Sequence, residues 1–135
     1  MEVTPYLFFE GRCEEASAFY KKAVGAQVLM QMRFKEAPDQ SGCPEGGGEK
    51  IMHMTMKIGD SLVQASDGRC SGTQGYQGFA LSLTPANDAD AEKYFKALSE
   101  GGQVQMPLTK TFFASKFGML ADRFGIMWMI YVKPA

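Results

Sequence analysis

The sequence predicts an α+β fold made of two β-α-β-β-β modules, and three observations lead to that prediction. The first is an internal repeat, in which an aromatic pair, a glycine and a Gln-Val dipeptide occur at 19–28 and again at 94–104. The second is that each aromatic pair lies on an apolar face with helical spacing. The third is the alternation of apolar and polar residues after each helix, which is typical of strands. Each half is too short to fold alone, so we expect the halves to be modules of one domain.

Length and charge exclude several classes of function. The chain has 135 residues, 45% of them hydrophobic, with 14 basic and 15 acidic residues and a net charge of −1. That length suits one compact domain. The balanced charge provides no broad electrostatic attraction to nucleic acid or to an anionic membrane, and no run reaches the roughly 18 apolar residues of a membrane span. We expect a soluble protein with no nucleic acid and no membrane among its partners.

The three cysteines are expected to be free thiols in a cytoplasmic protein. Cys13, Cys43 and Cys70 are odd in number and form no C-x-x-C pair. The N-terminus lacks the basic start and the long apolar run of a signal peptide. Structural roles are the simpler interpretation, and a reactive or redox role is the alternative.

The first module contains one helix between its first two strands. Ala16, Phe19, Tyr20 and Ala23 fall on one helical face, and Gly25 can supply the left-handed residue that ends the helix. Alternating apolar residues predict the strands that follow. The strands of this module are expected at 6–9, 28–34, 52–58 and 62–66.

The second module repeats this order. Its helix carries Ala91, Phe95 and Leu98 on one face, with Asn87 or Asp88 as the N-cap. A turn at 122–125 precedes the last strand. The strands of this module are expected at 79–83, near 104–106, at 119–121 and at 126–132.

Two polar, glycine-rich segments interrupt the modules. The segment 35–50 is either a lid or a disordered loop, since loops of this length are often one or the other. The segment 67–78 connects the halves. The predicted organisation is a single domain over 1–135, with module 1 at about 1–67, a linker at about 68–76 and module 2 at about 77–135.

Three segments carry motifs of a known family. Residues 4–9 read TPYLFF, residues 111–118 read TFFASKFG, and residues 122–130 read DRFGIMWMI. These motifs resemble the PhnB-like branch of the vicinal oxygen chelate superfamily, which includes glyoxalase I, bleomycin-resistance proteins and extradiol dioxygenases. The branch is also labelled 3-demethylubiquinone 3-methyltransferase-like. The resemblance covers nearly the whole chain.

The resemblance implies a curved eight-stranded mixed sheet around a cavity, with the helices outside, and a homodimer. In metal-dependent members of the superfamily, four side chains from the first and last strands of the modules coordinate one divalent ion. The corresponding positions here are Pro5, Gln64, Gly78 or Phe79, and Met129. Divalent cations such as Mg²⁺ and Zn²⁺ prefer carboxylate, imidazole or thiolate ligands, and only the Gln64 amide could contribute. We therefore expect no metal and no cofactor.

The label of methyltransferase finds no support in the sequence pattern. No G-x-G-x-x-G motif opens a helix after a strand, and the chain lacks a doubly wound α/β pattern that would hold S-adenosylmethionine.

Strand alternation selects the residues that would face the cavity. If Met52, Met54, Met56 and Ile58 pack against the helices, His53 faces the cavity, where the ring could act as a general acid or base. The alternative is an ordinary hydrogen-bonded histidine of a strand. Similarly, the last strand should turn three residues toward the helical layer: Trp128, Ile130 and Val132. The candidate ligand-binding residues are Arg33, His53, Gln64, Met127, Met129 and Tyr131, with Phe112 at the rim, and His53 is the one catalytic candidate.

These residues predict a protein that binds a small, partly apolar molecule without a metal. Methionine is flexible and polarizable, which suits a pocket that adapts to varied apolar ligands, although a methionine in a strand can equally be ordinary packing. One alternative is an isomerase or lyase that acts on a small oxygenated metabolite through His53. Another is a protein that makes protein–protein interactions only.

Overall fold

A computed structural model describes residues 1–39, 42–72 and 75–135. The chain divides into two units, Met1–Gln74 and Gly75–Ala135, and the division falls inside the segment 68–76 that the sequence predicts as a linker. Positions 40–41 of the predicted loop and 73–74 of the predicted linker lie outside the described residues.

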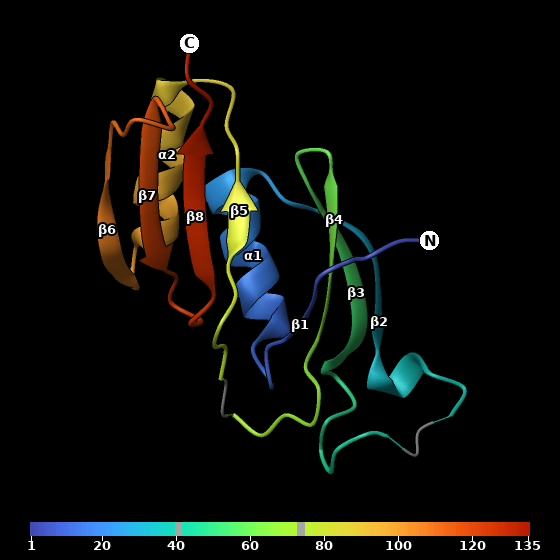
Figure 1. The fold of residues 1–135 in the computed structure, drawn as a ribbon. Coiled ribbons are helices and arrows are strands. Elements are labelled where there is room, and N and C mark those ends of the chain that lie inside the picture. The colour runs from blue at the N-terminus through green and yellow to red at the C-terminus, as the bar shows by residue number, and fades with distance from the viewer. Residues whose placement is uncertain (40–41, 73–74) are drawn as a thin grey trace. The chain divides into compact units, whose positions relative to one another are not determined.

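The first unit is a four-stranded sheet with one α-helix (Figure 1). Its strands lie in the order β1-β4-β3-β2, in which β1 is parallel to β4 and the other neighbours are antiparallel. A short 3-10 helix, η1, follows β2. The elements are β1 (Tyr6–Phe8), α1 (Cys13–Val24), β2 (Gln27–Arg33), η1 (Phe34–Glu36), β3 (Ile51–Ile58) and β4 (Ser61–Ser66).

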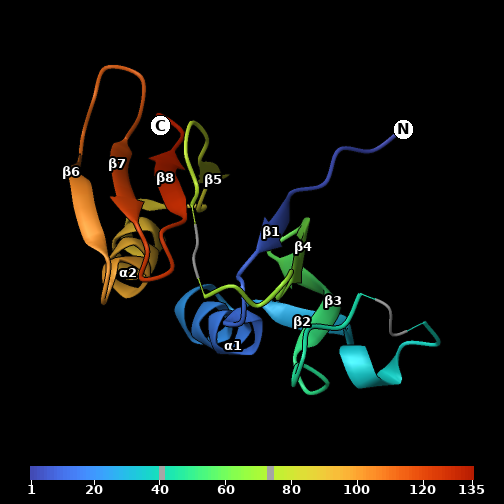
Figure 2. The ribbon, with the colours of Figure 1, turned by 90° about the horizontal axis from the view of Figure 1, so that it is seen from below.

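The second unit repeats the same topology (Figures 1 and 2). Its strands lie in the order β5-β8-β7-β6, with β5 parallel to β8 and the other neighbours antiparallel. The predicted pair of β-α-β-β-β modules is therefore confirmed, with four strands in each of two mixed sheets. The elements are β5 (Leu81–Leu83), α2 (Asp88–Ser99), β6 (Gln103–Thr109), β7 (Lys116–Ala121) and β8 (Met127–Val132).

Helix α1 packs its predicted apolar face against the sheet of its own unit. Ala16 and Tyr20 are buried in α1, which lies against β3, and the buried residues of β3 include Met54 and Met56. The helix ends at Gly25, whose φ of 71° is left-handed and whose N–H donates to the Lys21 carbonyl. A glycine adopts this conformation without the steric cost that a side chain would add.

Helix α2 lies against β6, β7 and β8 of the second sheet. Asn87 is its N-cap, because the side-chain oxygen accepts the Asp90 N–H at 2.8 Å. At Gly118 of β7, a Cβ atom would lie 2.7 Å from Cε2 of Phe95 and 3.0 Å from the Leu108 backbone. Only a glycine at this position lets the helix approach the sheet so closely.

Each sheet has one face that its own helix covers and one that it does not, which we call the helix-free face. In β8, Trp128, Ile130 and Val132 are buried on the covered face, as predicted. Met127, Met129 and Tyr131 alternate with them and are partly exposed on the helix-free face. The alternation of side chains along β8 therefore puts the three candidate site residues of this strand on the helix-free face.

Strand ends differ from the predicted ones by one to three residues. The strand predicted at 79–83 is confined to β5, and the one predicted near 104–106 extends over the seven residues of β6. Among the described residues, no helix is both long enough and apolar enough to cross a membrane.

Candidate functional site

A mixed polar and aromatic row crosses the helix-free face of the first sheet. Tyr6 of β1 pairs with Gln64 of β4, Gln64 with Thr55 of β3, and Thr55 with Met30 of β2. Directly paired residues of neighbouring strands project from the same face, with Cβ atoms about 5 Å apart. The row therefore brings a phenol, an amide, a hydroxyl and a thioether together on one surface.

His53 lies beside this row and is held at both ring nitrogens. Nδ1 lies 2.8 Å from the Tyr6 hydroxyl, and Nε2 lies 3.3 Å from the Thr55 hydroxyl. The Tyr6 ring also contacts the rings of His53 and Phe8, with centroids 5.6 and 5.0 Å away. The imidazole is thus fixed in position and orientation on a face that solvent reaches.

Partial burial raises the pKa of the Tyr6 phenol above its usual range, so the phenol keeps its proton at neutral pH. A protonated hydroxyl donates to Nδ1 of a neutral ring, and the Nε2–H can then donate to Thr55. The same hydroxyl can also turn to donate to an oxygen of a bound molecule. Tyr6, His53 and Gln64 can therefore orient a small oxygenated ligand, and the Tyr6–His53 pair can exchange a proton with it.

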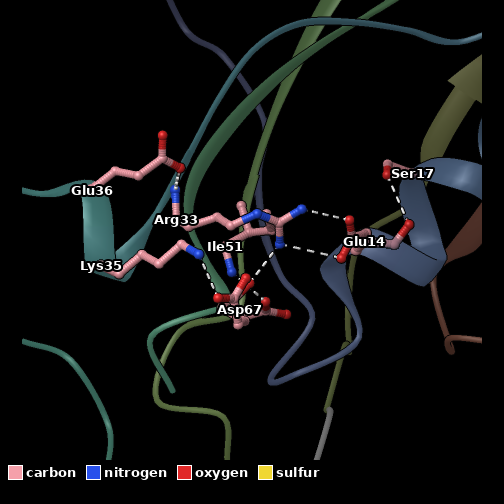
Figure 3. A network of polar contacts seen from close by, with 8 residues as sticks. Glu14, Ser17, Arg33, Lys35, Glu36, Ile51 and Asp67 are labelled. Carbon is pink, nitrogen blue, oxygen red and sulfur yellow. Dashed lines mark hydrogen bonds and ion pairs between the residues drawn. The ribbon is translucent and has the colours of Figure 1, made fainter. Parts of the chain in front are cut away.

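Arg33, the third polar candidate, is engaged by residues outside the Tyr6–Gln64 row. The guanidinium pairs with Glu14 of helix α1 at 2.8 Å and donates to the Glu49 carbonyl (Figure 3). This bond holds the pKa of the Glu14 carboxyl below its usual range. The register shifts between Met32 and Arg33, so that one step along β2 corresponds to two steps along β3. A ligand-binding role of Arg33 remains a prediction.

Asp67, which the sequence analysis did not single out, is the buried centre of the first unit. Its buried carboxylate accepts the N–H groups of Gly11 and Cys13 at 3.1 and 2.7 Å. It also accepts the N–H group of Ile51 at 2.7 Å (Figure 3). It thereby caps helix α1, where Arg12 offers no side-chain cap, and ties the helix to β3. Asp67 has a structural role, since its oxygens are occupied by the backbone.

A row of methionines crosses the helix-free face of the second sheet. Met106 of β6 pairs with Met119 of β7, which pairs with Met129 of β8. Next to Met129 is Ser82 of β5. This face therefore brings flexible, polarizable side chains together where the first sheet carries polar ones.

Aromatic side chains gather at one end of the methionine row. Phe117 pairs with Tyr131 on the same face, and the Phe113 ring lies 5.1 Å from Phe117 and 6.4 Å, nearly parallel, from Tyr131. The Tyr131 hydroxyl donates to the Phe113 carbonyl at 3.3 Å. Phe112 touches Phe113 and is 99% exposed, so it lies at the outer side of this aromatic group.

The motif at residues 122–130 stabilises the turn before β8. The buried Asp122 carboxylate accepts the N–H groups of Phe124 and Ile126, and its second oxygen accepts the Trp128 indole N–H at 2.9 Å. Gly125 closes the turn at φ 90°. The aspartate, glycine and tryptophan of this motif therefore form the turn and anchor it to β8.

The donors at the four superfamily positions do not fit a divalent ion. Gln64 supplies an amide, Met129 supplies a thioether, and the Pro5 carbonyl accepts the Gln64 N–H at 2.9 Å. Their neighbours Tyr6 and Ser82 add only hydroxyls. Within the part of the chain that the structure describes, no group of three or more His, Cys, Asp or Glu residues could hold a metal ion.

Sequence reasoning found part of this arrangement. Alternation alone predicted that His53, and in the last strand Met127, Met129 and Tyr131, face away from the helices, whereas Gln64 was selected through the family resemblance. Sequence reasoning missed Tyr6 and Thr55 as partners of the histidine. The alternation of β3 could have indicated Thr55, whereas Tyr6 depends on the pairing of β1 with β4.

Comparisons with known proteins agree with this architecture. The family described as 3-demethylubiquinone-9 3-methyltransferase matches residues 1–131. Protein YjdN of Escherichia coli strain K12 is 34% identical over 140 residues, which cover 98% of this chain and 95% of that protein.

Solved structures show the same fold. Protein PA1353 from Pseudomonas aeruginosa is 37% identical, covers 98% of both chains and superposes with a TM-score of 0.86. The PhnB protein from Bacillus cereus, at 23% identity, covers 98% of this chain and 99% of its own, with a TM-score of 0.76. A glyoxalase-related enzyme from Fulvimarina pelagi, at 15% identity and with 99% and 89% coverage, has a TM-score of 0.62. The last two likenesses concern the fold alone.

The match over nearly the whole chain leads to one conclusion, with which the fold of the paired modules agrees: this protein belongs to the family described as 3-demethylubiquinone-9 3-methyltransferase.

Proposed function

We propose that this protein binds a small, partly apolar molecule and does so without a divalent metal ion. The observation that carries the proposal is the hydrogen bond between Tyr6 and His53, beside Gln64, on the helix-free face of the first sheet. Ligand sites commonly combine a few placed polar groups with apolar surroundings. Here Phe8 and Leu62 supply apolar surface on the same sheet.

The second sheet has a largely apolar surface of its own, to which we also assign ligand-binding residues. Met127, Met129 and Tyr131 project from its helix-free face, and Phe112 is exposed at the outer side of the aromatic group. Methionine side chains adjust their shape to varied apolar partners. We assign these four residues, with His53 and Gln64, to ligand binding.

Methyl transfer, which the family description names, is not the function we propose. S-adenosylmethionine and dinucleotides are usually held at the switch point of a doubly wound parallel sheet. The two sheets here are four-stranded, and in each only one of the neighbouring pairs is parallel. A binding role agrees better with this architecture. We further propose a cytoplasmic homodimer, with neither nucleic acid nor membrane as a partner.

The test is to identify a molecule that co-purifies with the chain. Protein purified under native conditions is denatured, and the released small molecules are compared by mass spectrometry among variants. Tyr6→Phe and Gln64→Ala should lower the amount of the bound molecule, since each removes a polar contact. Lys22→Gln, on the exposed side of helix α1, serves as the control and should leave it unchanged. Equal amounts in all four proteins would contradict the proposal.

An enzyme of the isomerase or lyase type is the alternative, and the same hydrogen bond favours it. A tyrosine that keeps its proton, beside an imidazole, provides a proton donor and a proton acceptor without a metal. Once a substrate is known, His53→Ala should lower kcat far more than it weakens substrate binding. Unchanged turnover in that variant would exclude this mechanism.

A further inference from the structure

Three methionines form one continuous row on the helix-free face of the second sheet. Met106, Met119 and Met129 occupy β6, β7 and β8, and each is the direct register partner of the next. The opposite face of these strands is covered by helix α2 and contains the buried residues Leu120 and Ile130. The three thioethers therefore do not belong to the packed core of the unit.

The three sulfur atoms are able to meet at one point. Register partners have Cβ atoms about 5 Å apart, and the methionine side chain has three rotatable bonds that allow the outer two to lean toward the middle one. Irregular pairing on both sides of Met106 interrupts the regular pleat there, and such bulges often redirect a side chain. Met106 is also 42% exposed, so an ion from solvent can reach it.

The chemistry of the row selects one class of ion. Thioether sulfur is a soft, neutral donor that favours Cu(I) over Mg²⁺ or Ca²⁺, which need oxygen ligands. One residue pair further along β7 and β8, Phe117 and Tyr131 lie on the same face. Aromatic faces favour a nearby cation, so both kinds of side chain favour a soft monovalent cation.

The first sheet provides the contrast. The corresponding row there consists of Met30, Thr55 and Gln64, with a single thioether. The duplicated architecture thus carries three adjacent sulfur atoms in one unit and one in the other. This difference makes the first sheet an internal control for any effect of methionine in general.

We propose that Met106, Met119 and Met129 form a binding site for a soft monovalent cation, Cu(I), on the second sheet. The site shares Met129 with the residues assigned to ligand binding on the second sheet, but it needs neither Tyr6 nor Gln64, and it differs from the divalent site of metal-dependent relatives in both ligand and ion. The bound ion would be coordinated by the three sulfur atoms, and no proton needs to be released because thioethers carry none.

The test uses Ag(I), a redox-stable soft ion, as the probe. The protein is labelled with carbon-13 at the methionine methyl groups, its accessible thiols Cys43 and Cys70 are blocked with N-ethylmaleimide, and silver nitrate is added in chloride-free buffer. The methyl signals of Met106, Met119 and Met129 should shift together and saturate at one ion per chain. Competition with bicinchoninate under anaerobic conditions repeats the measurement with Cu(I).

Leucine variants separate sulfur chemistry from apolar packing, because Met→Leu conserves volume and apolar character. Met119→Leu, which removes the central sulfur, should weaken Ag(I) and Cu(I) binding at least about tenfold, equal to about 1.4 kcal/mol, while Met30→Leu should change it less than about twofold. Parallel shifts of Met30 and Met32, or unchanged affinity when all three row methionines are leucine, would overturn the proposal. Circular dichroism confirms that each variant is folded.

Discussion

The hydroxyl of Tyr6 lies 2.8 Å from Nδ1 of His53, although 47 residues separate them and strand β4 lies between their strands. The contact exists because β1 is the edge strand of the sheet and pairs in parallel with β4. This pairing puts Tyr6 opposite Gln64. The tyrosine then reaches across β4 to the histidine on β3. One strand pairing thus assembles the polar part of the candidate site.

Tyr6 should ionise later than an ordinary tyrosine. Partial burial raises the pKa of its phenol above the unfolded value of about 10. The stability that this shift contributes is fully present below pH 10 and is lost as the pH rises through the folded pKa. The difference in tyrosinate absorbance at 295 nm between the wild type and Tyr6→Phe isolates this group among the five tyrosines. A midpoint at or below pH 10 would contradict the environment described for Tyr6.

Replacing Asp67 should destabilise the first unit strongly. Its buried carboxylate accepts three backbone N–H groups, and Asp67→Asn puts an NH₂ group where an acceptor is needed. The expected loss is about 2–3 kcal/mol of unfolding free energy, measured by urea denaturation. Asp60→Asn, in the exposed turn between β3 and β4, is the control and should cost less than about 0.5 kcal/mol. Equal effects at the two positions would show that Asp67 is not a capping group.

Asp122 and Trp128 should be energetically coupled. The carboxylate accepts the indole N–H at 2.9 Å, and both side chains are buried. A double-mutant cycle with Asp122→Ala and Trp128→Phe should give a coupling free energy of about 1.5–3 kcal/mol, since the acceptor is charged. Far-ultraviolet circular dichroism follows unfolding, because Trp128 is the single tryptophan. Additive effects of the two substitutions would mean that the bond contributes little.

Gly118 should not tolerate even a methyl group. An added Cβ would lie 2.7 Å from the Phe95 ring and 3.0 Å from the Leu108 backbone, so Gly118→Ala should cost about 1–3 kcal/mol as helix α2 moves outward. Gly75, with nothing within 4 Å of its Cβ position and no positive φ, is the matched control. Gly75→Ala should be neutral or slightly stabilising. Thermal unfolding of both variants measures the two changes in stability, and an equal midpoint temperature for Gly118→Ala and the wild type would contradict the close contact described at Gly118.

The sequence predicted what local periodicity determines and missed what long-range pairing determines. The repeat and the alternation of Trp128 and Ile130 identified both modules and the two faces of β8, because these features depend on the covalent order alone. The ion pair of Arg33 with Glu14 was missed because it joins strand β2 to helix α1, which the residue pattern of either element does not show. Tyr6 was missed because the neighbour of β1 is set by tertiary structure. The DRFG turn was identified by its resemblance to a family motif, and the structure shows its role, since the Asp122 carboxylate anchors the turn to Trp128.

The central claim is that the chain binds a small molecule without a divalent ion, and native mass spectrometry of the intact protein tests it most directly. Protein purified once with and once without chelator should give the same folded species, carrying one small-molecule adduct and no divalent ion per chain. That adduct should be reduced in Tyr6→Phe. One tightly held divalent ion per chain, lost together with the adduct when chelator is present, would contradict the account.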